Sequence, residues 1–357
     1  MATILFGSIS TLADTSELQR QAFNDAARAL FVPPGDIDDA VSEIAIYERQ
    51  GRVPESKHPL ASRNPAAPHL PEPDWSQEGY PSDCAMHAID RWFVRVVDAN
   101  PGLRPRVGNP DELRSNHMGA TLDRLRHRVN QSEPGVADAV DGAVITALNE
   151  EAVAGAALAN KGGINLIVSY EAFAMKMLGG LRQEIIFSRH QREAGKTPGW
   201  ISVPLVVTSH TWENAKNEQS HQDPTIGEAL LGEMSDTSRV LFPVDANSAA
   251  AALRSVYRGR GQVACLIVSK RDMPHRLDAE AAERFVNIGA AHIDGDPNGA
   301  ALQLVTIGAY QLEEALKAAH RLKAHGRRVV VTAISEPGRF RAPRDPLEAE
   351  FTARDDQ

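Results

Sequence analysis

Two histidines stand in a polar segment that follows one of the most apolar stretches of the chain. His210 and His221 come after the apolar run at 201–208, together with a tryptophan and several amide side chains. Ligands bind in the loops that follow the strands of an open α/β sheet, and histidine titrates near neutral pH. Both side chains are therefore candidates for proton transfer to and from a substrate. The alternative is a loop in which Asp223 and Thr225 only cap the next helix, but capping requires neither histidine.

Three further groups of residues carry side chains suited to binding or acid–base chemistry. A polar segment at 109–117 offers amide, hydroxyl, carboxylate and imidazole groups. Glu150 and Glu151 form a carboxylate pair at a predicted helix start. Their spacing favours a structural role over a catalytic one, because acidic side chains at a helix start stabilise the helix dipole. Tyr170 and Phe173 stand at a predicted strand-to-helix junction and would, by residue type, be ordinary core aromatics. Residue type therefore leaves the chemistry of these groups open.

The elements that would position these residues alternate between apolar strands and helices. Runs rich in Val, Ile and Leu predict buried strands at 164–170, 201–208, 239–244, 263–268, 302–308 and 329–334. Helices are predicted at 84–98, 171–194, 225–234, 248–258, 279–288 and 311–325. Strands that are each followed by a helix imply a doubly wound, mainly parallel sheet covered on both faces. The predicted fold class is therefore α/β.

Proline content and strand spacing divide the chain into four parts. Residues 1–31 predict a short strand followed by a helix. Repeated prolines make 32–82 an extended linker or arm, because proline interrupts helices and sheets. The main α/β domain is predicted at 83–275. A second α/β unit at 276–357 shows only two clear strands and ends in a polar tail, so we expect it to be an incomplete domain.

Composition and charge exclude several classes of partner. The 357 residues carry a formal net charge of −9 at pH 7, which argues against nucleic acid or a membrane surface but allows a local cationic pocket for a phosphorylated substrate. Cys84 and Cys265 lie far apart in the sequence and predict neither a disulfide nor a zinc framework, so no metal site is expected in this chain. No apolar run reaches membrane-spanning length and the first residues do not resemble a secretory leader, so we expect a cytoplasmic protein.

Four motifs occur in order along the α/β part of the chain. They are Pro110-Asp111-Glu112-x-x-Ser115-Asn116, Tyr170-Glu171-Ala172-Phe173, Thr208-Ser209-His210-x-Trp212 and Ser220-His221-Gln222-Asp223-Pro224. Together they resemble the phosphoketolase family, from about residue 75 to about residue 341, and the segment 243–247 and Lys270 also fit. The stretch 149–155 is similar to the pyrimidine-binding domain of transketolase-like enzymes in general.

The resemblance implies an enzyme that uses thiamine diphosphate with Mg²⁺, in which this chain forms the pyrimidine-binding domain. It implies that Glu150 hydrogen-bonds the pyrimidine N1′ and that Tyr170 and Phe173 wall the ring, while the cofactor carries the carbanion. His210 and His221 resemble residues that act on the sugar hydroxyls and in the dehydration step. The residues that would bind the sugar phosphate are Ser115, Asn116, His117, Gln222 and Lys270.

The chain also departs from the family's motifs. His117 stands where phosphoketolases usually have arginine, residues 216–218 replace a His-Asn-Gly, and residues 160–163 replace a Gly-Arg-His-Gly. The Gly-Asp-Gly motif that helps to hold a metal-bound diphosphate does not occur before the main domain, and Gly295-Asp296 falls far past its expected place. The first 25 or so residues resemble a degenerate start of a haloacid-dehalogenase-like phosphatase, whose two aspartates are missing here.

These features lead to the prediction of a split phosphoketolase-like enzyme. A separate diphosphate-binding chain would complete the site, or else a homo-oligomer would form, and the helix at 170–194 would contribute an apolar face to the contact. The implied reaction cleaves xylulose 5-phosphate or fructose 6-phosphate with inorganic phosphate into acetyl phosphate and an aldose phosphate. Two alternatives stay open: a non-catalytic remnant or interaction module of the same fold, and a transketolase-like transfer of a two-carbon unit.

Overall fold

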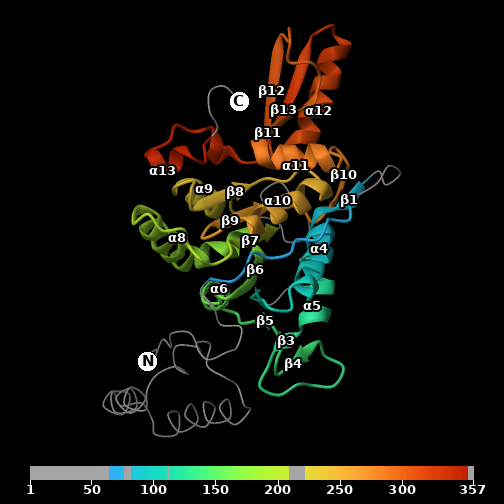
Figure 1. Cartoon of the computed structure of the whole chain (residues 1–357). Coiled ribbons are helices and arrows are strands. Elements are labelled where there is room, and N and C mark those ends of the chain that lie inside the picture. The colour runs from blue at the N-terminus through green and yellow to red at the C-terminus, as the bar shows by residue number, and fades with distance from the viewer. Residues whose placement is uncertain (1–63, 76–81, 111–112, 209–221, 353–357) are drawn as a thin grey trace, which may run out of the picture.

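The computed structural model describes residues 64–75, 82–110, 113–208 and 222–352. The predicted strand and helix at 1–31, most of the arm at 32–82, and the candidate histidines His210 and His221 lie outside these ranges. The described part is built around one large sheet with helices on both sides, and a smaller sheet stands at one end of it (Figure 1).

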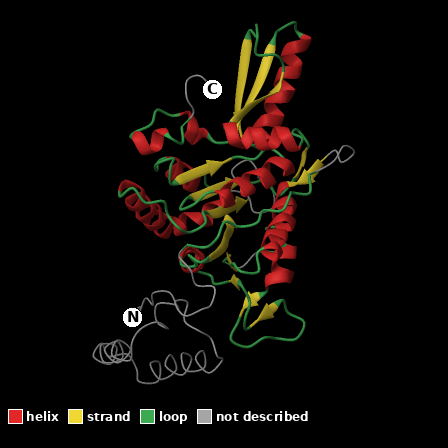
Figure 2. Ribbon diagram, viewed as in Figure 1, coloured by secondary structure: helices red, strands yellow, loops and turns green. Residues whose placement is uncertain are grey.

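The large sheet has eight strands in the order β4-β3-β5-β2-β6-β7-β9-β8. Every pair of neighbouring strands in it is parallel, which confirms the predicted α/β fold. Figure 2 shows the strands in yellow between red helices. The strands are β2 (Arg104–Gly108), β3 (His127–Arg128), β4 (Asp138–Ala139), β5 (Val144–Ile145), β6 (Gly163–Tyr170), β7 (Val203–Thr208), β8 (Ser238–Leu241) and β9 (Val263–Ile267).

The strand β6 illustrates why the central strands read as continuous apolar runs. All of its residues are buried, and their side chains alternate between two cores. Leu166 and Val168 belong to one apolar cluster, whereas Ile167 belongs to the other. The first cluster includes side chains of α4 (Ala85–Ala99), α5 (Gly119–Leu125) and α10 (Ala246–Arg258), and the second includes side chains of α6 (Glu150–Leu158), α8 (Leu178–Glu193) and α9 (Thr225–Leu231). Both faces of the sheet are therefore covered, as expected for parallel strands.

The helix predicted at 171–194 consists of three consecutive pieces. These are α7 (Glu171–Ala174), the 3₁₀ turn η2 (Met175–Met177) and α8. Leu181 and Ile185 of α8 are buried against the sheet, whereas Ile186 and Phe187 are 53% and 49% exposed. The apolar face that we expected this helix to expose is thus mostly internal, because one apolar stripe of α8 packs on the sheet. Two large apolar side chains remain exposed next to that stripe.

The second unit has a three-stranded sheet in the order β11-β13-β12. The strands β12 (Leu302–Ile307) and β13 (Val329–Ile334) are parallel and were predicted, whereas β11 (Ala290–Asp294) is antiparallel to β13 and was not. The helix α12 (Ala309–Ala324) packs on this sheet. Phe285 of α11 (Ala279–Ile288) lies in the same apolar cluster as the large sheet, so the core is continuous across the predicted domain boundary. The boundary at 276 stays a prediction.

A short antiparallel pair of strands holds the start of α4 against the segment that follows β9. In it β1 (Ser82–Cys84) pairs with β10 (Asp272–Pro274), and Cys84 lies opposite Asp272. This contact places residues that are distant in sequence next to the loop after β9.

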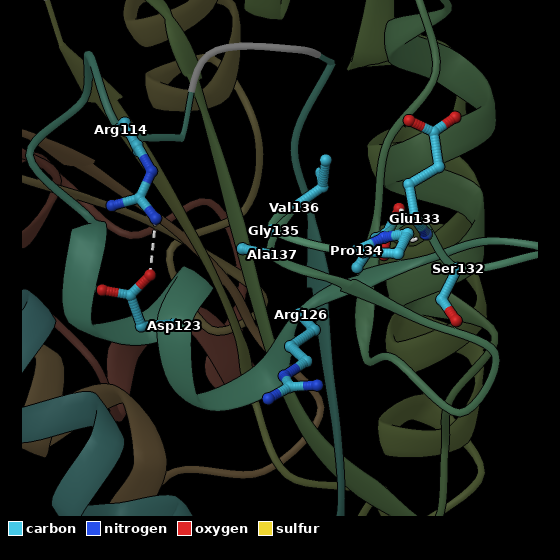
Figure 3. A pocket seen from close by; sticks show the side chains of 10 residues that line it. Arg114, Asp123, Arg126, Ser132, Glu133, Pro134, Gly135, Val136 and Ala137 are labelled. Carbon is cyan, nitrogen blue, oxygen red and sulfur yellow. Dashed lines mark hydrogen bonds and ion pairs between the residues drawn. The ribbon is translucent and has the colours of Figure 1, made fainter.

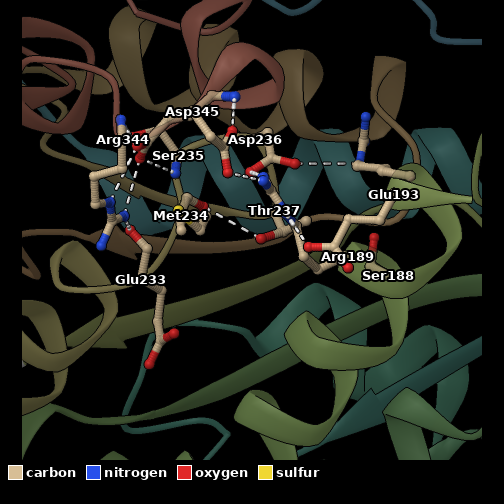
Figure 4. A network of polar contacts seen from close by, with 12 residues as sticks. Ser188, Arg189, Glu193, Glu233, Met234, Ser235, Asp236, Thr237, Arg344 and Asp345 are labelled. Atoms are coloured by element: carbon tan, nitrogen blue, oxygen red, sulfur yellow. Dashed lines mark hydrogen bonds and ion pairs between the residues drawn. The ribbon is translucent and has the colours of Figure 1, made fainter. Parts of the chain in front are cut away.

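The polar tail predicted from residue 341 is docked on the protein as far as residue 352. It includes α13 (Pro346–Ala349) and follows the 3₁₀ turn η4 (Pro337–Phe340). Figure 4 shows that Arg189 pairs with both Asp236 and Asp345. In the same segment, Glu348 accepts hydrogen bonds from Arg341 and Arg344. Charged side chains, rather than an apolar stripe, hold this segment, which is why its sequence looks like a free tail.

Candidate active site

The carboxyl ends of four neighbouring strands bring the candidate residues together. Since β2, β6, β7 and β9 are adjacent and parallel, the chain leaves all four at one edge of the sheet. Ser115 and Asn116 follow β2, Tyr170 ends β6, and Lys270 follows β9. This is the edge at which open α/β sheets bind ligands.

Direct contacts join most of these side chains. The Ser115 Oγ lies 2.6 Å from the Tyr170 hydroxyl, and the Lys270 Nζ lies 4.7 Å from the centre of the Tyr170 ring. Thr208, the last residue of β7, donates a hydrogen bond to the Asn116 side chain. An ammonium group over an aromatic face is attracted by the ring quadrupole, so Lys270 is held at the rim of the site. The structure therefore assembles Ser115, Asn116, Tyr170 and Lys270 as one group.

The aromatic pair continues this group toward Glu150. The rings of Tyr170 and Phe173 meet edge to face, with centroids 6.0 Å apart. The Lys176 Nζ lies 5.4 Å from the Phe173 ring and 3.1 Å from the Glu150 Oε1. Glu150 is buried, whereas Lys176 is largely exposed. Successive contacts therefore connect the two aromatic rings, the lysine and the buried carboxylate along one side of the site.

Local structure explains why Glu150 is held there. Asn149 caps α6 by accepting a hydrogen bond from the Ala152 amide, so Glu150 is the first helical residue. A Cβ added to Gly108, at the end of β2, would lie 2.5 Å from the Val153 carbonyl oxygen, so only glycine lets α6 approach the strand end this closely. Glu151, the other member of the pair, is exposed.

Residues 222–225 follow the two candidate histidines in the chain, and the structure describes them. Asp223 accepts a hydrogen bond from the Thr225 amide, as the capping alternative predicts, and its hydrogen bonds from Thr225 lower the pKa of Asp223. The Asp223 amide in turn donates to the buried carboxylate of Glu171, which follows Tyr170 in the chain. Gln222 is half-buried. Asp223 is therefore tied to the residue that follows Tyr170 at the strand end.

His117 faces a different set of side chains. Its Nδ1 lies 3.3 Å from the Cys84 sulfur, and its ring is stacked on His87 with centroids 4.8 Å apart. Its backbone has a φ of 59°, which is uncommon for a residue other than glycine. The predicted substrate residue His117 therefore lies at a neighbouring cluster.

Sequence reasoning missed two residues that the structure places at the site. Lys176 was hidden within a predicted helix, and only its helical spacing from Phe173 could have shown that it reaches the same surface. Asn109 belongs to the polar segment at 109–117, but the sequence does not show its structural role. Its amide donates to the Val168 carbonyl across the strands, and this hydrogen bond supports the end of β2.

A separate hollow of about 590 Å³ lies beside α5, near the loop between β3 and β4. Figure 3 shows Arg114 and Asp123 on its wall as an ion pair, with Arg126 and the loop around Glu133 nearby. Its lining is polar and open, without aromatic side chains that could stack on a flat ring. The strand-end group, rather than this hollow, has the side chains suited to a heteroaromatic cofactor.

The chain is similar in sequence to proteins named as phosphoketolases. Residues 87–259 match the sequence model of the family described as D-xylulose 5-phosphate/D-fructose 6-phosphate phosphoketolase. A protein of Schizosaccharomyces pombe named "Probable phosphoketolase" is 28% identical over 228 residues, which cover 62% of this chain and 27% of that protein. A protein of Lactococcus lactis with the same name is 24% identical over 303 residues, which cover 78% of this chain and 37% of that protein.

Solved structures resemble the chain in fold. Transketolase of Pichia stipitis aligns with a TM-score of 0.60 at 16% identity, over 79% of this chain and 38% of that one. Transketolase of Leishmania mexicana aligns with a TM-score of 0.57 at 18% identity, over 88% of this chain and 40% of that one. None of the helices in the described ranges is long and apolar enough to span a membrane.

The chain spans between 27% and 37% of the length of these two curated relatives. The family match at 87–259 includes Ser115 and Tyr170 and ends before Lys270. Residues 87–259 of this chain are thus similar in sequence to the phosphoketolase family, and the fold of the chain resembles that of transketolase.

Proposed function

We propose that this chain is the pyrimidine-binding component of a phosphoketolase-like enzyme and that a separate diphosphate-binding chain completes its active site. The observation that carries the proposal is the continuous group at the strand ends. It runs from Ser115 and Lys270 through Tyr170 and Phe173 to Lys176 and the buried carboxylate of Glu150.

The side chains present suit the pyrimidine half of thiamine diphosphate. A flat heteroaromatic ring needs apolar or aromatic walls and a few polar groups that fix its orientation. Tyr170 and Phe173 offer the aromatic walls, and Glu150 offers a buried carboxyl group within the same chain of contacts. The fit concerns the ring and not the diphosphate.

The diphosphate and its metal ion need residues from elsewhere. The 357 residues contain no Gly-Asp-Gly motif. Among the residues that the structure describes, the only cluster of three or more possible metal ligands is Cys84, His87 and His117. Mg²⁺ prefers oxygen ligands, and this cluster offers sulfur and nitrogen. In the proposal, the separate chain supplies the diphosphate and Mg²⁺ sites.

Each group at the strand ends then has a specific task. Bound thiamine diphosphate supplies the carbanion chemistry that protein side chains lack. Glu150 holds a proton at the pyrimidine N1′, and Lys176 steadies its carboxylate. Lys270 and Ser115 bind the phosphate of the ketose, because an ammonium and a hydroxyl are suitable donors to phosphate oxygens. His210 and His221 transfer protons at the sugar hydroxyls.

A reconstitution experiment tests this proposal. The tagged chain is co-purified from its own cells, and the associated chain that carries a Gly-Asp-Gly motif is co-expressed with it. We expect acetyl phosphate, measured as its hydroxamate, to form from xylulose 5-phosphate or fructose 6-phosphate only when thiamine diphosphate, Mg²⁺ and inorganic phosphate are all present.

The same assay separates the alternatives. Transfer of a two-carbon unit to an aldose acceptor without phosphate would identify a transketolase-like activity instead. Absence of both activities from a complex that binds thiamine diphosphate would show a non-catalytic component.

A further inference from the structure

We propose that Cys84, His87 and His117 form a binding site for a transition-metal ion of the Zn²⁺ class, separate from the cofactor's own metal. One ligand atom from each of the three residues lies within 4.8 Å of the other two. A thiolate and two imidazoles form a donor set that Zn²⁺ accepts, and three protein ligands leave a fourth position open. The proposal does not depend on the function proposed above.

The distances suit one ion. Zinc binds sulfur at about 2.3 Å and imidazole nitrogen at roughly 2.0–2.1 Å, so two ligand atoms of a tetrahedral site lie roughly 3.3–3.6 Å apart. The Cys84 Sγ and the His117 Nδ1 are already 3.3 Å apart. His87 is exposed, and one of its ring nitrogens lies within 4.8 Å of the other two ligand atoms.

The fold presents the three ligands from two segments. Cys84 is the N-cap of α4, and His87 is three residues further on, so both lie on one side of the first helical turn. His117 comes from the loop after β2, where its left-handed φ of 59° is a strained conformation for a residue with a side chain. A metal–nitrogen bond would stabilise this strained conformation, because it would fix the loop against α4.

The surroundings of the sulfur also suit a cation. Cys84 is 1% exposed and its thiol donates to the Lys270 carbonyl at 3.3 Å, which orients the sulfur. Asp272 lies opposite Cys84 in the β1–β10 pair, and Asp83 precedes it in the chain. Asp83 is paired with Arg91 at 3.1 Å, so Asp272 is the carboxylate that adds negative charge near the three ligands.

The site would connect three segments that frame the strand ends. These are the start of α4, the loop with Ser115 and Asn116, and the segment after β9 that carries Lys270.

Metal binding by the full chain tests the proposal. The protein is stripped with a chelator and titrated with Zn²⁺ against a chromophoric competitor, and in parallel with Co²⁺. We expect one ion per chain, a thiolate-to-cobalt charge-transfer band, and a rise in melting temperature on adding Zn²⁺. Cys84→Ser and His87→Ala should each weaken Zn²⁺ binding by at least about tenfold, since even loss of a residue behind the ligands costs that much.

Two matched variants control for unspecific binding. Cys265→Ala removes the other buried cysteine, and His320→Ala removes another exposed helical histidine, on α12. Both should bind Zn²⁺ like the unchanged chain. If Cys84→Ser does not fold, the exposed His87 decides the question. Undiminished Zn²⁺ binding by His87→Ala, or no Zn²⁺ binding by the unchanged chain, would overturn the proposal. The contact between Cys84 and His117 would then be only a thiol–imidazole hydrogen bond.

Discussion

The Ser115 hydroxyl and the Tyr170 hydroxyl lie 2.6 Å apart, although 55 residues separate them in the chain. Ser115 belongs to the loop after β2 and Tyr170 is the last residue of β6, and the two strands are parallel neighbours. Parallel pairing therefore brings two of the proposed binding residues together at one sheet edge. The relationship connects the motifs in which these residues occur, and it can be tested directly.

Removal of either hydroxyl should cost the same free energy of unfolding. Tyr170→Phe keeps the ring and Ser115→Ala keeps the backbone, and each should destabilise the chain by about 1 kcal/mol, as expected for one hydrogen bond. Urea denaturation of both single variants and the double variant gives the coupling energy. The double variant should lose little more than either single one. Strictly additive losses would show that the two hydroxyls do not interact.

The two adjacent glutamates should differ sharply in the reconstituted enzyme. Glu150→Gln keeps the shape but cannot hold the proton at N1′, so we expect kcat to fall at least about 100-fold, a typical contribution of acid–base catalysis. Glu151→Gln is the matched control, because Glu151 is exposed on the same helical turn. Steady-state kinetics at saturating cofactor measures both. Equal losses would mean that another residue acts at N1′.

The docked C-terminal segment should make stability depend on pH. Burial acts to raise the pKa of Glu348, but hydrogen bonds from Arg344, the Ser235 amide and Arg341 outweigh it and hold the pKa well below the ordinary value of 4.5. A depressed folded-state pKa stabilises the protein above pH 4.5, and this contribution is lost as the pH falls through the folded pKa.

Glu348→Gln isolates this contribution. At neutral pH we expect a loss of about 1–3 kcal/mol in the free energy of unfolding, because charged hydrogen bonds are replaced by neutral ones. The difference from the unchanged chain should shrink below pH 4.5. Denaturation curves across this range measure it, and a difference that stays constant with pH would contradict the assignment.

The sequence predicted the large sheet well because parallel strands covered on both faces leave long apolar runs. The strands β6, β7 and β9 are of this kind. The strands β3, β4 and β5 have two residues each and leave no periodic pattern to recognise. The strand β11 was missed because its residues are half-buried or exposed, which gives no apolar run.

The candidate site was predictable only where a motif ended a strand. Ser115, Asn116, Tyr170 and Lys270 follow strands that the fold places side by side. The contact between Lys176 and Glu150 joins two helices, and neither spacing nor residue type shows such a pair. The cluster around Cys84 escaped notice because the cysteines were compared only with each other, whereas His117 reaches Cys84 through the β2 loop.

Association of this chain with itself or with a partner through α8 remains a prediction. The surface available for it is smaller than the apolar face expected for the whole helix at 170–194. Ile186 and Phe187 are its large exposed apolar side chains, and such side chains gather at interfaces more often than on free surfaces. Sedimentation at micromolar concentration should show self-association or capture of the partner chain, and Ile186→Glu should weaken it. Ile288→Glu, at an exposed position on α11, is the control. A clean monomer would count against this surface.

Calorimetry with thiamine diphosphate and Mg²⁺ tests the central claim most directly. In the proposal, much of the cofactor's affinity comes from a metal-bound diphosphate that the separate chain holds. The chain alone should therefore bind the cofactor weakly, and the complex with the diphosphate-binding chain should bind it tightly. Glu150→Gln should weaken binding by the complex. Submicromolar binding of thiamine diphosphate by this chain without any partner would contradict the split-enzyme account.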